Sequence, residues 1–384
     1  MVSLEDYKGR EQAYVKHVLL ERYLEALVHK TASVYPHIVY VDGFAGPWQS
    51  ANEHHEDTSF GIALRTLRTA KAAWKGKRRD VKMTAILIEK SASAFKELEK
   101  LPPKFPDIEI IPQKGDFVGL IPNILSKIPR DAFSFFLLDP KGWRIPLNAL
   151  QPMLARPNSE VLFNFMFEFI NRAASIDDSV VVTGLNELLP SGDWRQQLSQ
   201  STTSDQRKEV LVAAFTECLS QAGNFKHVCE TTILRPDRDR PLYSLFYGTR
   251  HDRGLEVFRD CQVKALEAQA ATRAATKVDK AEAKSRQTEM FGSFHEMNEN
   301  EASTFLESEK NKARAALVAL TPDKLNPILY KDLWPLVLAK HVVRLTAVNQ
   351  LAAQLRKENV IDFPDWEPRR RVPQPHYRCC RKEN

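Results

Sequence analysis

The stretch HIVYVDGFAGP, residues 37–47, decides the fold of this chain. It begins with an apolar, β-branched run and stops in a glycine-rich turn, which is the pattern of a buried strand followed by a sharp reversal. A helical pattern over residues 11–30 precedes it, with apolar side chains such as Val15, Val18 and Leu19 on one face. We therefore expect a helix, a buried strand and a tight turn in this order.

Four more apolar runs follow, and helical segments separate them. They are MTAILIE (83–89), DIEIIP (107–112), FSFFLLD (133–139) and EVLFNF (160–165). Strands that alternate with helices predict an α/β fold whose doubly wound, mostly parallel sheet is covered on both faces. Residues 225–236 and 240–249 differ, because the short polar turn between them predicts an antiparallel terminal hairpin at the sheet edge. Five parallel strands with such a hairpin form the strand pattern of class I methyltransferases, a comparison of fold alone.

Three parts are expected along the chain. Residues 1–260 form the Rossmann-type, methyltransferase-like domain, with a helical insertion at about 171–223. Residues 261–309 are rich in Ala, Glu, Lys and Gln and predict a long exposed helix or a partly helical linker.

Residues 310–384 contain three helical stretches followed by an extended, basic segment. This order predicts a winged-helix-like domain, with Thr346 as N-cap and residues 346–357 as its recognition helix. A three-helix module that packs against another protein fits the same pattern equally well.

Composition limits the class of protein. The 384 residues are 43% hydrophobic and 27% charged, as in ordinary globular proteins. No apolar run approaches the roughly 18 residues of a membrane span, and the N-terminus lacks the layout of a signal peptide, so we expect a cytoplasmic protein without membrane contact. The five cysteines form no Cys-x-x-Cys pair, which argues against a structural zinc site.

The positive charge is concentrated near the C-terminus. Residues 310–384 hold 15 Lys and Arg against 7 Asp and Glu, whereas the rest of the chain holds 40 against 42. Such segregation indicates a tail that faces nucleic acid, either DNA or RNA. The candidate contact residues are Arg356, Lys357, Arg369, Arg370 and Arg371.

Four acids stand at the carboxyl ends of successive predicted strands: Asp42, Glu89, Asp116 and Asp139. Because the carboxyl ends of parallel strands meet at one edge of a sheet, we expect these acids to surround a common crevice. A strand-end acid suits a positively charged ligand such as S-adenosylmethionine (SAM).

In this interpretation the first three acids have a role toward SAM. Asp42 binds the amino group, and Gly43, Phe44 and Gly46 form a turn that a ligand can approach closely. Glu89 accepts hydrogen bonds from the ribose hydroxyls, while Asp116 meets the adenine and Phe117 lines its ring. Structural alternatives remain open: a strand-end turn at Asp42, a helix-capping carboxylate at Glu89 and an N-cap at Asp116.

The fourth strand runs into Asp139-Pro140-Lys141-Gly142-Trp143. Amino-methyltransferases carry an acid or amide here, followed by Pro-Pro and an aromatic residue. Asp139 and Pro140 would hold the target amine, and Trp143 would stack on the base. Lys141 instead favours a phosphate or another anionic partner. The loop at 53–57, EHHED, could bind a metal, but a solvated loop is preferred because adjacent side chains rarely point at one centre.

Taken together, these motifs resemble the three-Cys-motif partner protein family, which is similar to class I SAM-dependent methyltransferases. The shared segments are KHVLLERYL (16–24), YVDGFAGP (40–47), ILIE (86–89), GDF (115–117), LLDPKGW (137–143) and EVLFNF (160–165), and the resemblance runs over roughly residues 10–260. It implies a radical-SAM-like partner whose three cysteines bind a cluster, and work on nucleic acid or in phage defence. Trp48 departs from the family where a glycine is expected, and its ring would either narrow the cofactor turn or form one of its walls.

The leading hypothesis is a SAM-dependent methyltransferase that acts on nucleic acid. The first alternative is a non-catalytic, nucleic-acid-binding subunit that uses a relic methyltransferase fold to position its partner. The second alternative is a metal-dependent nuclease, for which the strand-end acids would supply ligands.

Overall fold

The computed structural model describes residues 2–7, 10–46, 50, 55–140, 142–285 and 292–382, without the side chains of 277–285 and 292–301. Trp48, expected at the cofactor turn, and Lys141, expected to favour an anionic partner, lie outside these residues. Glu53 and His54 of the acidic loop also lie outside them. The chain divides into two compact units, Met1–His251 and Asp252–Asn384, and each is described by itself.

Unit 1 contains a seven-stranded sheet in the order β3-β2-β1-β4-β5-β7-β6. The strands β1 to β5 are parallel, and β7 runs antiparallel between β5 and β6. Their bounds are β1 His37–Asp42, β2 Lys82–Glu89, β3 Glu109–Lys114, β4 Phe133–Leu138, β5 Ser159–Phe165, β6 His227–Leu234 and β7 Pro241–Thr249. The predicted α/β fold, with its mostly parallel sheet and terminal hairpin, is confirmed, and the strand order is methyltransferase-like.

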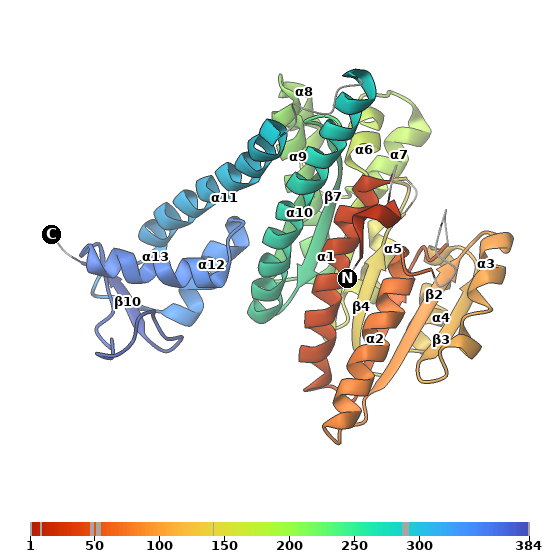
Figure 1. Ribbon diagram of the computed structural model, residues 1–384, viewed down its shortest axis with the longest axis horizontal. Helices are drawn as coiled ribbons and strands as arrows, with labels where there is room; N and C mark the ends of the chain where they lie inside the picture. The colour runs from red at the N-terminus through yellow and green to blue at the C-terminus, as the bar shows by residue number, and fades with distance from the viewer. Residues whose placement is uncertain are drawn as a thin grey trace. The chain divides into compact units, whose positions relative to one another are not determined.

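Helices cover both faces of this sheet, as Figure 1 shows for α1 and α2 on one of them. The helices of unit 1 are α1 Glu11–Ala32, α2 Ser59–Gly76, α3 Ala92–Leu98, α4 Phe117–Ser126, α5 Leu147–Leu154, α6 Phe167–Ala173, α7 Ser179–Leu188, α8 Trp194–Gln200 and α9 Ser204–Gly223, with short 3₁₀ helices at Leu4–Tyr7 and Pro102–Lys104. The expected helical insertion corresponds to α6 through α9, between β5 and β6.

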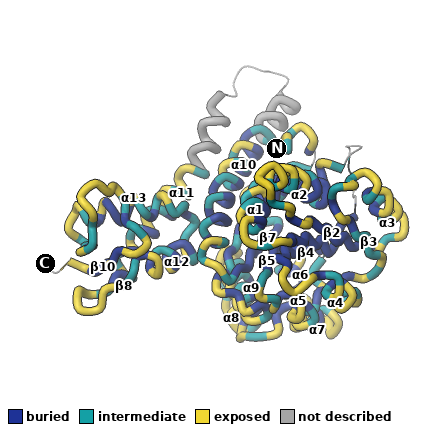
Figure 2. The backbone as a smooth tube through the Cα atoms, turned by 90° about the horizontal axis from the view of Figure 1, so that it is seen from below, coloured by how far each residue is buried: buried dark blue, intermediate teal, exposed yellow. Residues whose placement is uncertain are grey.

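Alternation along the central strands assigns each side chain to one helical layer. In β1, Ile38 and Tyr40 pack toward α1 and α2, whereas Val39 and Val41 join the core under α4, α5 and the insertion. Successive strand residues point to opposite faces of the sheet, and helices bury both faces. This explains why residues 38–41 of β1 are apolar without alternation. Figure 2 shows the result as dark blue, buried strands inside a shell of exposed helix surface.

A buried polar network fixes α1 on the sheet. The Tyr23 hydroxyl donates to the Glu160 carboxylate of β5, and Thr249 of β7 donates to the same carboxylate at 2.7 Å. Burial raises the pKa of Glu160, and the hydrogen bonds oppose that rise. Because an unsatisfied buried polar group is costly, these bonds hold α1 at one position along β5 and β7.

Unit 2 consists of α10 Asp252–Ser285, α11 Gly292–Leu320, β8 Ile328–Leu329, α12 Tyr330–Lys340, α13 Leu345–Lys357, β9 Ile361–Asp362 and β10 Arg378–Arg381. The three short strands pair antiparallel in the order β8-β10-β9. Residues 346–357 are helical as expected, but α13 begins one residue earlier and its N-cap is Arg344, not Thr346.

The expectation of an exposed helix or linker near residue 261 is only half correct. The segment is helical, yet Cys261, Val263 and Ala265 of α10 are buried, with 4%, 6% and 0% exposure. The expectation of exposure failed because the charged, alanine-rich sequence contains an apolar stripe at helical spacing. Helices α11 and α12 pack against α10. Among the described residues, no helix combines the length and the apolar character that crossing a membrane requires.

Candidate functional site

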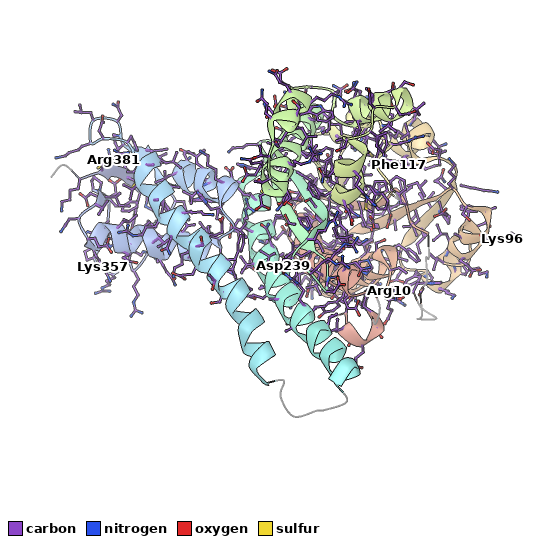
Figure 3. The ribbon with its side chains drawn as sticks, turned by 90° about the horizontal axis from the view of Figure 1, so that it is seen from above. Arg10, Lys96, Phe117, Asp239, Lys357 and Arg381 are labelled. Atoms are coloured by element: carbon purple, nitrogen blue, oxygen red, sulfur yellow. The ribbon has the colours of Figure 1, made fainter. Side chains whose placement is uncertain are left out.

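A cavity of about 700 Å³ opens at the carboxyl edge of the parallel strands of unit 1. Seven of the residues expected at the cofactor and target site line it: Gly43, Phe44, Glu89, Asp116, Phe117, Pro140 and Trp143. They come from the turns that follow β1, β2, β3 and β4, the edge at which doubly wound folds bind ligands. Figure 3 labels Phe117, which lies at the start of α4 in this unit.

The turn after β1 forms an apolar wall of the cavity. Backbone bonds tie it to both neighbouring strands, from Gly43 N to the Leu137 carbonyl at 3.0 Å and from Ala45 N to the Ile88 carbonyl at 2.8 Å. A Cβ atom on Gly43 would lie 3.1 Å from the Phe117 ring, so glycine allows that ring to approach the backbone. Phe117 in turn contacts Phe44, with ring centroids 5.5 Å apart.

Two carboxylates stand at the end of the cavity below β2 and β3. Glu89 is only 5% exposed, and its Oε1 accepts a hydrogen bond from Ser91 N at 2.5 Å. Within the described part of the chain, no hydrogen bond occupies the other oxygen, Oε2. Asp116 occupies the N-cap position of α4 but makes no capping hydrogen bond; it pairs with Lys90 at 3.5 Å.

The structure does not bring Asp42, Gly46 and Asp139 into this lining. Asp42 is fully buried, and its carboxylate accepts hydrogen bonds from Ser59 Oγ at 2.7 Å, from Tyr40 Oη at 3.0 Å and from Phe44 N at 3.1 Å. Its side chain continues the face of Ile38 and Tyr40, toward α1 and α2. The strand-end turn that was left open as an alternative is therefore what the structure shows around Asp42.

Asp139 follows the same alternation and points toward α1. Its Oδ2 forms an ion pair with Lys16, and its Oδ1 accepts a hydrogen bond from Asn164 Nδ2 at 2.5 Å. Burial raises the pKa of Asp139, but Lys16 and Asn164 outweigh burial and hold it below the ordinary value. Asp139 is therefore ionised and already paired, which makes it a weak base and leaves it no free oxygen for a target amine in this conformation.

Among the described residues, Lys16 is the cation that forms an ion pair with this acid. Its neighbour His17 is buried and hydrogen-bonded through Nδ1 to Tyr7 Oη at 2.8 Å. Burial, and then the charge of Lys16, lower the pKa of His17 to about 3, so the imidazole is neutral. The sequence placed Lys16 in a helix before the first strand and carried no signal that it would reach the fourth.

The opposite end of the cavity is aromatic and basic. A Cβ atom on Gly184 of α7 would lie 2.7 Å from Cζ3 of Trp143, so the insertion closes tightly on the indole. The Arg144 guanidinium lies 5.4 Å from the Trp143 ring centroid. Phe169 of α6 also lines the cavity. Sequence reasoning missed both Arg144 and Phe169. Phe169 was missed because a lone aromatic residue in a short helix most often packs in the core.

The candidate nucleic-acid contacts in unit 2 fall into two groups. Lys357, Arg369 and Arg371 are exposed, and Arg370 is exposed but paired with Glu367 at 3.0 Å. Arg356 instead stacks on Trp366 at 4.5 Å, with Asp362 at 4.0 Å, so its guanidinium supports the turn after β9. Figure 3 shows Lys357 at the periphery of this unit. Among the described residues, no group of three His, Cys, Asp or Glu side chains is arranged to hold a metal ion.

No protein-family model matches this chain, and no curated protein matches it. Similar solved structures include protein LPL1258 from Legionella pneumophila, with 13% identity over 62% of this chain and 85% of that chain and a TM-score of 0.37. Loganic acid methyltransferase with SAH matches at 8% identity over 79% and 91%, with a TM-score of 0.30. YcgJ from Bacillus subtilis matches at 12% identity over 59% and 98%, with a TM-score of 0.26. All three TM-scores are below 0.5. The assignment of the fold therefore rests on the strand order described above.

The buried Asp42 carboxyl predicts a specific pH dependence of stability. Burial raises its pKa from 3.8 to about 6, against the opposing hydrogen bonds from Ser59, Phe44 N and Tyr40. The folded state therefore holds a proton that the unfolded state releases, and stability falls as pH rises from about 4 to about 6. The loss is about 3 kcal/mol at 1.36 kcal/mol for each pKa unit.

Asp42→Asn should remove this dependence. Urea unfolding at pH 4 and pH 7.5 gives the free energy of unfolding of the wild type and of the variant, and hence their difference at each pH. We expect the variant to gain in relative stability at the higher pH. A difference that is the same at both pH values would contradict a raised pKa at Asp42.

Proposed function

We propose that unit 1 is a SAM-dependent methyltransferase that acts on nucleic acid, and that unit 2 binds the same nucleic acid. The observation that carries the proposal is the cavity at the carboxyl edge of a methyltransferase-like sheet, with carboxylates at one end and aromatic side chains at the other. Its volume of about 700 Å³ falls within the roughly 300–1,000 Å³ of small-molecule and cofactor sites.

The lining residues fit the chemistry of SAM. The free oxygen of Glu89 suits the ribose hydroxyls, and the exposed carboxylate of Asp116 suits the adenine amino group. Phe44 and Phe117 provide an apolar wall for the base, and Gly43 keeps the backbone close to the ligand. Asp42 is not part of this set, because its carboxylate is turned into the protein.

The chain's own contribution to the reaction is positioning. Bound SAM would supply an electrophilic methyl group: the acceptor's electron pair would form the new bond to carbon as the carbon–sulfur bond breaks, S-adenosylhomocysteine would leave, and the acceptor's proton would pass to solvent. Trp143 orients the acceptor base by stacking, and the Pro140 carbonyl can accept a hydrogen bond from it. Asp139, locked by Lys16 and Asn164, fixes the start of this turn and acts as a positioning residue. Holding the two reactants in line supplies most of the rate in such a reaction.

Unit 2 is proposed to be a winged helix. From α11 onward its order is helix, strand, two helices and a two-stranded hairpin, with β8 and β9 on either side of β10. In this assignment α13 is the recognition helix, and residues 363–377 form the wing that carries the three consecutive arginines, Arg369 to Arg371. Exposed guanidinium groups on a projecting loop suit contacts with phosphates.

The partner and the biological role are proposals that rest on the family resemblance. The resemblance supports a radical-SAM-like three-Cys-motif protein as partner and a role in phage defence. Co-purification of the two proteins from cells that express both would support the partnership.

A second candidate function has its own observation. Both carboxylate oxygens of Asp139 are occupied by side chains of this chain, which suits a relic site in a non-catalytic, nucleic-acid-binding subunit. Cofactor binding separates the two candidates, because a relic subunit has no need to bind SAM or its product S-adenosylhomocysteine (SAH). No observation among the described residues favours the metal-dependent nuclease.

Calorimetric titration with SAH tests the first candidate. The wild type should bind SAH, and Glu89→Gln should weaken binding about tenfold or more, because a hydrogen bond to a charged group contributes roughly 1.5–3 kcal/mol. The matched control is Glu97→Gln, which changes an exposed carboxylate of α3 that is paired with Lys100 at 2.7 Å and lies outside the cavity lining. Absence of binding by the wild type at millimolar SAH would reject the enzyme in favour of the relic subunit.

Replacing Arg369, Arg370 and Arg371 together by alanine tests the wing. Affinity for DNA or RNA oligomers should fall to a similar extent for all sequences, and the slope of log affinity against log salt should decrease by about 2 to 3. Lys100→Ala with Lys104→Ala, two exposed lysines of unit 1, is the control. Equal affinity and slope before and after the triple change would make unit 2 a protein-contact module.

A further inference from the structure

The cavity of unit 1 has two chemically different ends. Glu89 and Asp116 stand at the end below β2 and β3, whereas Trp143, Arg144 and Phe169 stand at the end supplied by the turn after β4 and by α6. A nucleoside with hydroxyl and amino groups accounts for the acidic end. The aromatic and basic end calls for a second ligand that is both planar and negatively charged.

Phe169 is exposed although its neighbours are buried. Its side chain is 46% exposed, while Phe167 and Ile170 of the same short helix are 5% and 1% exposed and fill the core. The helix therefore anchors itself through those two residues and presents Phe169 to the cavity. The exposed ring contributes little to the core and is available for contact with a ligand in the cavity.

Each aromatic ring at this end has a guanidinium over one of its faces, which leaves the opposite face for a ligand. Arg172 lies 5.0 Å from the Phe169 ring centroid, and Arg144 lies 5.4 Å from that of Trp143. Both arginines are exposed. The acid of the same helix does not offset them, because Glu168 is paired with Arg235 and lies 3.5 Å from Arg240.

We infer that this end is a subsite for one unpaired base of a single-stranded nucleic acid together with its flanking phosphates. Phe169 and Trp143 are the stacking surfaces, and Arg144 and Arg172 contact the phosphates. The inference rests on the proposed function for the adjacent cofactor end and narrows the proposed nucleic-acid substrate to an unpaired base. A base inside a duplex cannot lie between two protein rings, so the target is single-stranded or flipped out.

An apolar peptide is the competing occupant, and the chemistry of the side chains separates the two. A peptide needs only apolar contact at Phe169, whereas a base needs the π-face of the ring. Phe169→Leu keeps the apolar contact and removes stacking, and Phe169→Tyr keeps both. Neither change disturbs the core, because the side chain is not part of it.

The test uses the full chain and a single-stranded pentanucleotide with 2-aminopurine at its centre, whose fluorescence is quenched on stacking. It is carried out in the wild type and in the background in which Arg369, Arg370 and Arg371 are alanine, so that the wing does not mask the site. Phe169→Leu should weaken binding roughly 5- to 100-fold and lose the quenching, while Phe169→Tyr retains both. Ile176→Ala, an exposed apolar residue just after α6 and outside the cavity lining, is the control and should change neither.

SAH titration of the same variants separates this inference from the proposed function. If Phe169→Leu binds SAH and the pentanucleotide as the wild type does, the subsite is rejected and the methyltransferase proposal stands. If Phe169→Leu loses the pentanucleotide but the wild type does not bind SAH, the subsite stands on a non-catalytic subunit. An apolar peptide could also be tested as a competitor of the pentanucleotide. If it displaces the pentanucleotide and binds the wild type and Phe169→Leu with equal affinity, the subsite is overturned.

Discussion

The ion pair between Lys16 and Asp139 is the interaction on which the candidate site depends. Strands β1 and β4 are neighbours in the sheet, and both are followed at their carboxyl ends by an acid that points toward α1 and α2. Asp42 is fully buried and Asp139 is partly buried, and taking such carboxyl groups out of water is costly unless a cation or hydrogen bonds compensate. Lys16 supplies the cation, and Tyr23, bonded to Glu160, holds the helix that carries Lys16. Asp42 responds to the same environment with a raised pKa.

This arrangement determines which of the strand-end acids line the cavity. Because Asp139 is committed to Lys16, the carboxylates that face the cavity are those that follow β2 and β3. The turn after β4 then contributes Pro140 and Trp143 but not its acid. The cavity has an acidic end, which suits a nucleoside, and an aromatic, basic end, which suits a nucleotide. The second end forms where the insertion of α6 and α7 closes on Trp143.

The sequence predicted the sheet and the edge that carries the cavity, since continuous apolar runs and glycine-rich turns depend on local pattern. It also held an unused signal: Asp42 has the same parity as Tyr40, and a strand's alternation sends both to one face. The partner of Asp139 could not be predicted, because Lys16 lies 123 positions away and meets it only through the fold. Phe169 was equally hidden, since its exposure depends on how α6 is anchored.

The most direct measurement is a crystal structure of the full chain grown with SAH. The account predicts a nucleoside in the cavity, with its ribose against Glu89 and its base against Phe117, while Lys16 still pairs with Asp139. A ligand bound to Asp42 or Asp139 with that ion pair broken, or an empty cavity at saturating SAH, would contradict it.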